Sequence, residues 1–161
     1  MFDKTIEADI EIVASPAEVW WQLTDFESYP KWNPLLIDVR GVAEEGRHLT
    51  VTVKPDGLPP VVIRPEVVVC EPQRELRWVG RLGVPHLLDT EHAFVIESVG
   101  MNRVRFIQRE IFSGVLAPGG TTLLGEQTLE GIQAMNEALR QRAEAAHATA
   151  EAARARRQER E

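Results

Sequence analysis

Residues 13–34, VASPAEVWWQLTDFESYPKWNP, decide the fold of this chain. An apolar strand ends at Val13, and Ser15 is placed to cap a helix that begins at Pro16. Proline is favoured at the first helical position because the N–H that it lacks would have no partner there. Glu18, three residues after Ser15, completes a capping box. The stretch therefore predicts a short helix that ends near Thr24.

The second half of the stretch is aromatic and contains two prolines. A second helical turn is expected over Phe26–Tyr29, followed by a bend. Pro30 and Pro34 bias the residues before them, Tyr29 and Asn33, toward extended backbone. The stretch therefore predicts a strand, two short helices and an aromatic bend in succession, and the fold of the whole chain must contain this order of elements.

Length and charge narrow the class of protein. The chain has 161 residues, 43% of them hydrophobic, and its formal net charge is −7. That length suits one domain with a sizeable core. The negative charge argues against a nucleic-acid partner, because binding phosphates needs a clustered positive surface. Cys70 is the single cysteine, so no intramolecular disulfide is expected. With no basic, apolar leader and no membrane span in the sequence, we expect a cytoplasmic protein.

Strand patterns dominate residues 3–112. Residues 3–13 alternate between isoleucine or alanine and polar side chains. Six further runs follow with short turns between them, which predicts an antiparallel meander rather than parallel β-α-β units. These runs are residues 35–42, 47–54, 61–70, 74–82, 86–99 and 103–112. Pro65 lies inside one run and predicts an edge or a bulge there, because proline cannot donate to a strand ladder.

A helical period begins near Thr121. Its apolar stripe comprises Leu124, Thr128, Ile132, Met135 and Leu139. The stripe fades into alanines, and residues 140–161 carry six arginines and four glutamates. We interpret residues 1–145 as one domain and residues 146–161 as a charged Ala/Arg/Glu-rich helical tail. The predicted fold is α+β: a curved seven-stranded antiparallel sheet around a long C-terminal helix, with two short helices after the first strand.

Several motifs resemble those of the START/Bet v 1-like (SRPBCC) superfamily, in particular its bacterial polyketide cyclase/dehydrase and lipid-transport subgroup. The resemblance covers residues 3 to about 145. Besides the stretch 14–34, it rests on residues 76–80 (LRWVG), 91–94 (EHAF), 108–114 (QREIFSG) and 135–139 (MNEAL). It implies a helix-grip fold with a cavity between sheet and helix. The superfamily includes lipid carriers, aromatase/cyclases and a chaperone cofactor, so the resemblance leaves the function open.

Polar side chains are expected on the inner face of the sheet. Alternation places Gln108 and Glu110 inward together with Phe106 and Phe112, and the arginines of the same strand outward. The same pattern turns His92 inward. An apolar wall with a few polar groups is typical of a small-molecule pocket. His92 and Glu110 are the candidate catalytic acid and base, with a purely structural hydrogen-bond network, or a Glu110 that reaches the rim, as the alternatives.

The ligand-binding candidates come from four parts of the chain. Trp32 and Asn33 would lie at the cavity mouth, although Trp32 could instead plug the end of the fold and Asn33 could satisfy the turn before Pro34. The full set of candidates is Trp32, Asn33, Trp78, His92, Phe94, Phe106, Gln108, Glu110, Phe112, Ile132 and Met135. The four histidines lack paired metal-ligand spacing, so no metal and no cofactor are expected.

Three functions fit these patterns. The first is binding or carriage of a hydrophobic small molecule, such as a lipid, a polyketide or an isoprenoid-like compound, in the internal cavity. The second is a polyketide cyclase/dehydrase-type enzyme that uses the pocket acid and base. The third is a protein-interaction module of the chaperone-cofactor kind. A weak homo-oligomer or a protein partner bound through the C-terminal tail also stays open.

Overall fold

The computed structural model describes residues 2–82, 86–114 and 117–161. Within these ranges, eight strands, two α-helices and one 3₁₀ turn precede the last helix. In chain order the elements are β1 (Phe2–Ile12), α1 (Pro16–Thr24), η1 (Phe26–Ser28), α2 (Tyr29–Trp32), β2 (Leu36–Arg40), β3 (Thr50–Val53), β4 (Val61–Ile63), β5 (Glu66–Glu71), β6 (Glu75–Leu82), β7 (Leu88–Gly100), β8 (Arg103–Gly114) and α3 (Ala117–Glu159).

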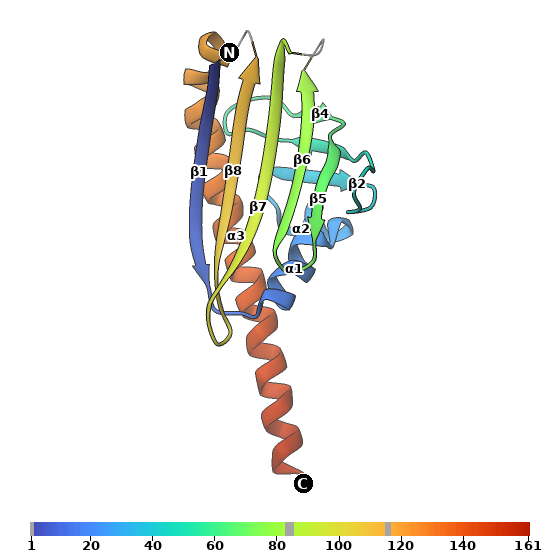
Figure 1. Cartoon of the computed structure of the whole chain (residues 1–161). Helices are drawn as coiled ribbons and strands as arrows, with labels where there is room; N and C mark the ends of the chain where they lie inside the picture. Colours follow the sequence, from blue (N-terminus) through green and yellow to red (C-terminus); the bar gives the residue numbers. More distant parts are fainter. Residues whose placement is uncertain (1, 83–85, 115–116) are drawn as a thin grey trace.

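The larger sheet has five antiparallel strands in the order β1-β8-β7-β6-β5. The first and last strands of the chain are therefore neighbours, and α3 packs on both of them across the sheet (Figure 1). On the outer face, Glu7 pairs with Arg109 and Asp9 pairs with Arg105. The opposite face of β8 is buried from Val104 to Phe112 at alternate positions, as the alternation predicted. The coarse α+β architecture is thus confirmed.

The strand count differs from the prediction. The expected run 61–70 is two strands: β4 belongs to a separate three-stranded sheet, β2-β3-β4, and β5 belongs to the large sheet. Pro65 lies between them, at a corner where the chain crosses from one sheet to the other. Its carbonyl accepts the N–H of Leu49, while its own nitrogen has no hydrogen to donate, so the ladder breaks there. The described ranges contain eight strands in two sheets, and Pro65 lies at a corner between β4 and β5, each of which is an edge strand of its sheet.

The helices after β1 follow the capping logic of the sequence. The Ser15 side chain accepts the N–H of Glu18, and the Glu18 carboxylate accepts the N–H of Ser15, so the capping box is complete. Asn33 is extended, as Pro34 requires, with φ −83° and ψ 115°. Tyr29 was expected to be extended before Pro30, but it is helical, with φ −53° and ψ −41°. Its hydroxyl donates to the carbonyl of Leu23, and this buried contact outweighs the local effect of Pro30.

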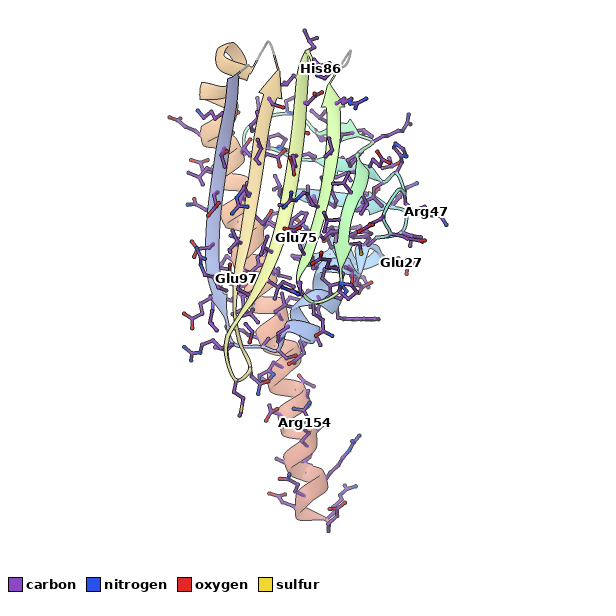
Figure 2. All side chains as sticks on the ribbon, viewed as in Figure 1. Glu27, Arg47, Glu75, His86, Glu97 and Arg154 are labelled. Carbon is purple, nitrogen blue, oxygen red and sulfur yellow. The ribbon has the colours of Figure 1, made fainter. Side chains whose placement is uncertain are left out.

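Helix α3 begins four residues before the expected Thr121 and is 43 residues long. Its middle turns pack on the sheet through Ile132, Met135 and Leu139, which are fully buried. Gly131 lets the helix approach closely, since a Cβ there would lie 2.7 Å from Cδ1 of Leu35. Beyond the sheet the helix continues alone toward the C-terminus, and Arg154 lies on this protruding part (Figures 1 and 2). No helix in the described ranges is long and apolar enough to cross a membrane.

Candidate functional site

Strand register places three candidate side chains in one row across the large sheet. Trp78 of β6 lies opposite His92 of β7, and His92 lies opposite Glu110 of β8. Because side chains alternate along strands, directly opposed residues point to the same face. Gln108 lies two residues before Glu110 on that same inner face, diagonal to His92. The convergence predicted from alternation is therefore present in the structure.

These polar groups form one hydrogen-bonded chain. Nδ1 of His92 is 2.6 Å from Oε2 of Glu110, and Nε2 of His92 is 2.8 Å from Oε1 of Gln108. The Gln108 amide in turn donates to Oδ1 of Asn136 on α3, at 2.7 Å. All four side chains are buried, with Gln108 fully inaccessible and Glu110 the most exposed at 9%. The chain links the sheet to the long helix through polar contacts inside an apolar interior.

The donors and acceptors along this series of hydrogen bonds determine where its protons lie. Because the Gln108 amide nitrogen donates to Asn136, Oε1 of Gln108 faces His92 and must accept, so Nε2 of His92 carries a hydrogen. One further proton lies between Nδ1 of His92 and Oε2 of Glu110. The pair has no net charge whichever atom holds that proton. A buried pair without net charge avoids the large desolvation cost of an isolated ion.

Aromatic rings surround this polar row. The ring of His92 stacks on Phe94 at a centroid distance of 4.2 Å, and Trp78 contacts both rings. Phe106 lies beyond Phe94 at 6.4 Å. The low polarity of these neighbours strengthens the hydrogen bonds of the chain and makes any unpaired member costly.

A cavity opens between the two sheets and α3, with a volume of about 160 Å³. The wall is mostly apolar, and its polar members are Arg81, Thr90, His92, Glu110 and Thr128. The volume is below the several hundred Å³ typical of pockets for drug-sized ligands. The lining residues are Leu35, Leu36, Val53, Pro55, Val61, Ile63, Trp78, Gly80, Arg81, Leu88, Thr90, His92, Glu110, Phe112 and Thr128.

Four of the eleven ligand-binding candidates line this cavity: Trp78, His92, Glu110 and Phe112. Five others lie behind the wall in the core, where they support it. These supporting residues are Phe94, Phe106, Gln108, Ile132 and Met135.

Trp32 and Asn33 lie outside the cavity lining, at the end of α2. Oδ1 of Asn33 accepts the N–H groups of Leu35 and Leu36, which is the turn role that the sequence left open. The ring of Trp32 packs edge-on against Tyr29 at 5.1 Å, and the guanidinium of Arg142 lies 5.9 Å from its centroid. Both side chains therefore fix the structure around α2, and their contact with a ligand stays a prediction.

The sequence alone did not identify two parts of the site. The first is Asn136, which occupies the buried face of α3 four residues after Ile132 and could have been found by extending the apolar stripe. The second is the far wall of the cavity, built by Leu35, Leu36 and residues of β3 and β4. Its strands were predicted, but nothing local to them signals that the corner at Pro65 turns them to face β6 and β7.

The chemistry of the site concentrates on one atom. Both ring nitrogens of His92 have partners, so the ring has no free nitrogen for a ligand. Oε1 of Glu110 has no hydrogen-bond partner among the described residues, and Glu110 lines the cavity. Glu110 can therefore accept a hydrogen bond or a proton from a bound molecule, and His92 positions it. No group of three or more histidine, cysteine or acidic side chains in the described ranges could hold a metal ion.

Solved structures share this architecture. A START superfamily protein from Mycobacterium smegmatis superposes with a TM-score of 0.70 at 21% identity, over 87% of this chain and 97% of that one. The aromatase/cyclase Zhui from Streptomyces sp. R1128 gives a TM-score of 0.68 at 16% identity, over 89% and 94%. Norcoclaurine synthase from Thalictrum flavum, in complex with dopamine and hydroxybenzaldehyde, gives 0.66 at 14% identity, over 87% and 86%. At these identities the likeness concerns the fold.

Sequence comparison is more specific. A search of curated protein sequences finds no match to this chain. The family model described as polyketide cyclase/dehydrase and lipid transport matches residues 3–144, which is most of the chain and includes every element of the cavity wall. The resemblance drawn from the motifs is thereby confirmed, and the chain belongs to the polyketide cyclase/dehydrase and lipid transport family.

Proposed function

We propose that the protein binds a hydrophobic small molecule in the cavity between its sheets and α3. The observation that carries this proposal is the cavity itself, whose lining is mostly apolar and in which Glu110 presents an oxygen that has no hydrogen-bond partner among the described residues. Pockets with an apolar lining and a few orienting polar groups are typical of small-molecule sites. Binding releases water from the apolar walls and costs the protein little rearrangement where the walls are already formed.

The volume limits the size of the bound part. An apolar cavity of roughly 150 Å³ is sufficient for a single aromatic ring, and this cavity is about 160 Å³. A lipid, a polyketide or an isoprenoid would therefore place one ring or a short chain inside and extend the remainder out of the mouth.

Native mass spectrometry of the purified protein tests binding directly. We expect a co-purified hydrophobic molecule, seen as an added mass that collisional activation removes. The variant Thr128→Phe fills the cavity from α3 and should lose that mass, because Thr128 is a lining residue. Thr149→Phe makes the same change at an exposed position of the same helix and serves as the control. Unmodified protein that carries no such molecule and also fails to bind p-xylene would contradict the proposal.

A second candidate function is enzymatic, of the cyclase/dehydrase kind. It is favoured by the short contact between His92 and Glu110 in the cavity wall and by the aromatase/cyclase among the structural neighbours. In this function Glu110 takes a proton from a carbon next to a ketone while His92 keeps the shared proton on Nδ1, so the pair becomes singly positive and balances the negative charge of the enolate.

Proton exchange gives a test that needs no natural substrate. In deuterium oxide, the protein should replace the methyl protons of acetophenone by deuterium faster than buffer does, through removal of a proton and return of a deuteron. Proton NMR follows the loss of the methyl signal. Glu110→Gln should reduce the rate to that of the buffer while Glu91→Gln, on the outer face of the neighbouring strand, should not. Equal rates for the native protein and Glu110→Gln would exclude Glu110 as the base.

A further inference from the structure

The polar end of the cavity has a fixed hydrogen-bonding character. The Gln108 amide nitrogen donates to Asn136, Nε2 of His92 donates to Gln108, and the remaining shared proton lies between Nδ1 of His92 and Oε2 of Glu110. If His92 holds that proton, Oε1 of Glu110 is a carboxylate oxygen. If Glu110 holds it on Oε2, Oε1 is a carbonyl oxygen. Oε1 accepts a hydrogen bond in both cases.

Within the described residues, no donor of the protein satisfies this oxygen. Oε2 contacts Nδ1 of His92, and neither Trp78 nor Phe112, which also line the wall, hydrogen-bonds to Glu110. An acceptor that a ligand cuts off from water lowers stability unless the ligand supplies the donor. A ligand that fills this cavity and displaces water must replace that donor.

From this geometry we infer that the ligand is a compact hydrophobic molecule of about one ring whose hydroxyl group donates to Oε1 of Glu110. The inference rests on the proposed binding function and adds the chemical class of the ligand. The size follows from the cavity of about 160 Å³. The donor follows from the direction of the chain Asn136–Gln108–His92–Glu110. The flat rings of Trp78 and Phe112 in the same cavity wall suit an aromatic ring as the hydrophobic part.

A pair of probes of equal size isolates the hydroxyl. In p-cresol and p-xylene a hydroxyl replaces a methyl group on the same ring, so both fill the cavity equally. Water holds p-cresol more strongly than p-xylene, so without a bond to Glu110 the protein would prefer p-xylene. Titration calorimetry or ¹⁵N-resolved NMR on the whole protein should instead give p-cresol an affinity about tenfold higher, equivalent to about 1.4 kcal/mol.

The side chains are tested by removing the pair as a unit. His92→Phe combined with Glu110→Leu leaves neither half of the pair unpaired and removes one further bond, the donor to Oε1 of Gln108, so it leaves no unpaired charge in the interior, unlike either single change. We expect this double variant to bind p-xylene at least as well as p-cresol. The control is Glu7→Gln combined with Arg109→Gln, which removes an ion pair on the outer face of the same sheet. It should keep the preference for p-cresol.

The outcomes separate the inference from the function on which it rests. If the native protein binds p-xylene as tightly as p-cresol, the ligand class is wrong while binding in the cavity stands. If it binds neither probe, the proposed function fails with it. A double variant that retains the preference would place the acceptor elsewhere than Glu110 and would also overturn the inference, with circular dichroism showing whether the variant is folded.

Discussion

Tyr29 is a buried polar side chain whose ionisation depends on the protein staying folded. It is fully buried, its hydroxyl donates to the carbonyl of Leu23, and its ring packs edge-on against Phe26 and Trp32. Burial raises the pKa of Tyr29 far above its ordinary value of 10, and the nearby charge of Asp25 raises it further. The phenol therefore stays protonated in the folded protein well into the alkaline range.

The chain has one tyrosine, so absorbance near 295 nm follows Tyr29 alone. We expect no phenolate signal from the folded protein as the pH passes 10. A raised folded pKa contributes stability that is complete below pH 10 and is lost as the pH rises further, so phenolate should appear only together with unfolding. Tryptophan fluorescence monitors unfolding in the same samples. Ionisation near pH 10 in a protein that is still folded would show that Tyr29 is accessible.

At the same scale, the polar chain shows what alternation along strands can predict. The inward orientation of His92, Gln108 and Glu110 follows from period two, because the arginines of β8 must face water. The bonds between them depend on the register of β7 against β8 and on the position of α3, which supplies Asn136. Register is set by the turn at Met101–Asn102 and the whole sheet, so the partners of each atom could not be deduced from one strand.

Among the elements, α1 depends on both ends of the chain. Glu18 closes the capping box with Ser15 and also contacts Nδ1 of His147 on α3, at 2.9 Å. Burial raises the pKa of Glu18, but the hydrogen bonds from Ser15 and His147 lower it by more, so the net pKa lies below the ordinary 4.5. A lowered carboxylate pKa contributes stability above pH 4.5 that is lost as the pH falls through the folded pKa.

Glu18→Gln tests this contribution. The variant keeps an acceptor for the N–H of Ser15 but removes the negative charge at the helix N-terminus, which stabilises by about 0.3–1 kcal/mol. Urea unfolding at pH 7 should show that loss relative to the native protein, and the difference should be smaller at pH 3. Glu71→Gln, at an exposed position of β5, should cause no comparable change at either pH. A pH-independent cost would assign the effect of Glu18 to packing rather than charge.

Gly131 couples α3 to the cavity. A Cβ at this position would lie 2.7 Å from Cδ1 of Leu35, and Leu35 lines the cavity from the other side. Alanine gains up to about 1 kcal/mol of helix propensity over glycine. The end of the Leu35 side chain can move into the cavity. The gain in helix propensity and the cost of displacing Leu35 therefore offset each other in the free energy of unfolding.

We therefore expect Gly131→Ala to change the free energy of unfolding by less than about 1 kcal/mol while weakening the binding of p-xylene severalfold. Chemical denaturation and titration calorimetry measure the two effects separately. Adding Leu35→Ala should restore the space and much of the affinity. The control Gln133→Ala lies on the exposed side of the same helix. An unchanged affinity in Gly131→Ala would mean that Leu35 moves away from the cavity.

For the whole molecule, the parts that the sequence predicted are those encoded locally. The capping box, the alternating strands and the apolar stripe of α3 each depend on residues close together in the chain. The cavity depends on where distant elements meet, and that is decided at corners such as Pro65, which sends β4 and β5 into different sheets. A proline inside a strand pattern signals a break, but the direction of the chain after the break is set by packing.

The C-terminal part of α3 has two sections: the first contacts the domain, and the second is exposed. Glu144 accepts the N–H of Val13, and His147 contacts Glu18, so α3 packs on the domain at least to His147. From Glu151 onward the side chains are exposed except for Ala153, which is partly buried. An alanine-rich surface buries little apolar area and is a weak seam for dimerisation. We therefore expect that removing the last eleven residues changes neither folding nor the oligomeric state.

Two truncations test this division. A chain that ends at Ala150 should keep its melting temperature within about 2 °C and its affinity for p-xylene, and light scattering should give one 18.1 kDa protomer for the full chain. A chain that ends at Ala143 loses both Glu144 and His147, so its melting temperature should fall clearly. If the full chain is instead an oligomer that the Ala150 truncation dissociates, the tail is an interface. In that case ligand binding should survive the truncation, because the tail touches no part of the cavity wall.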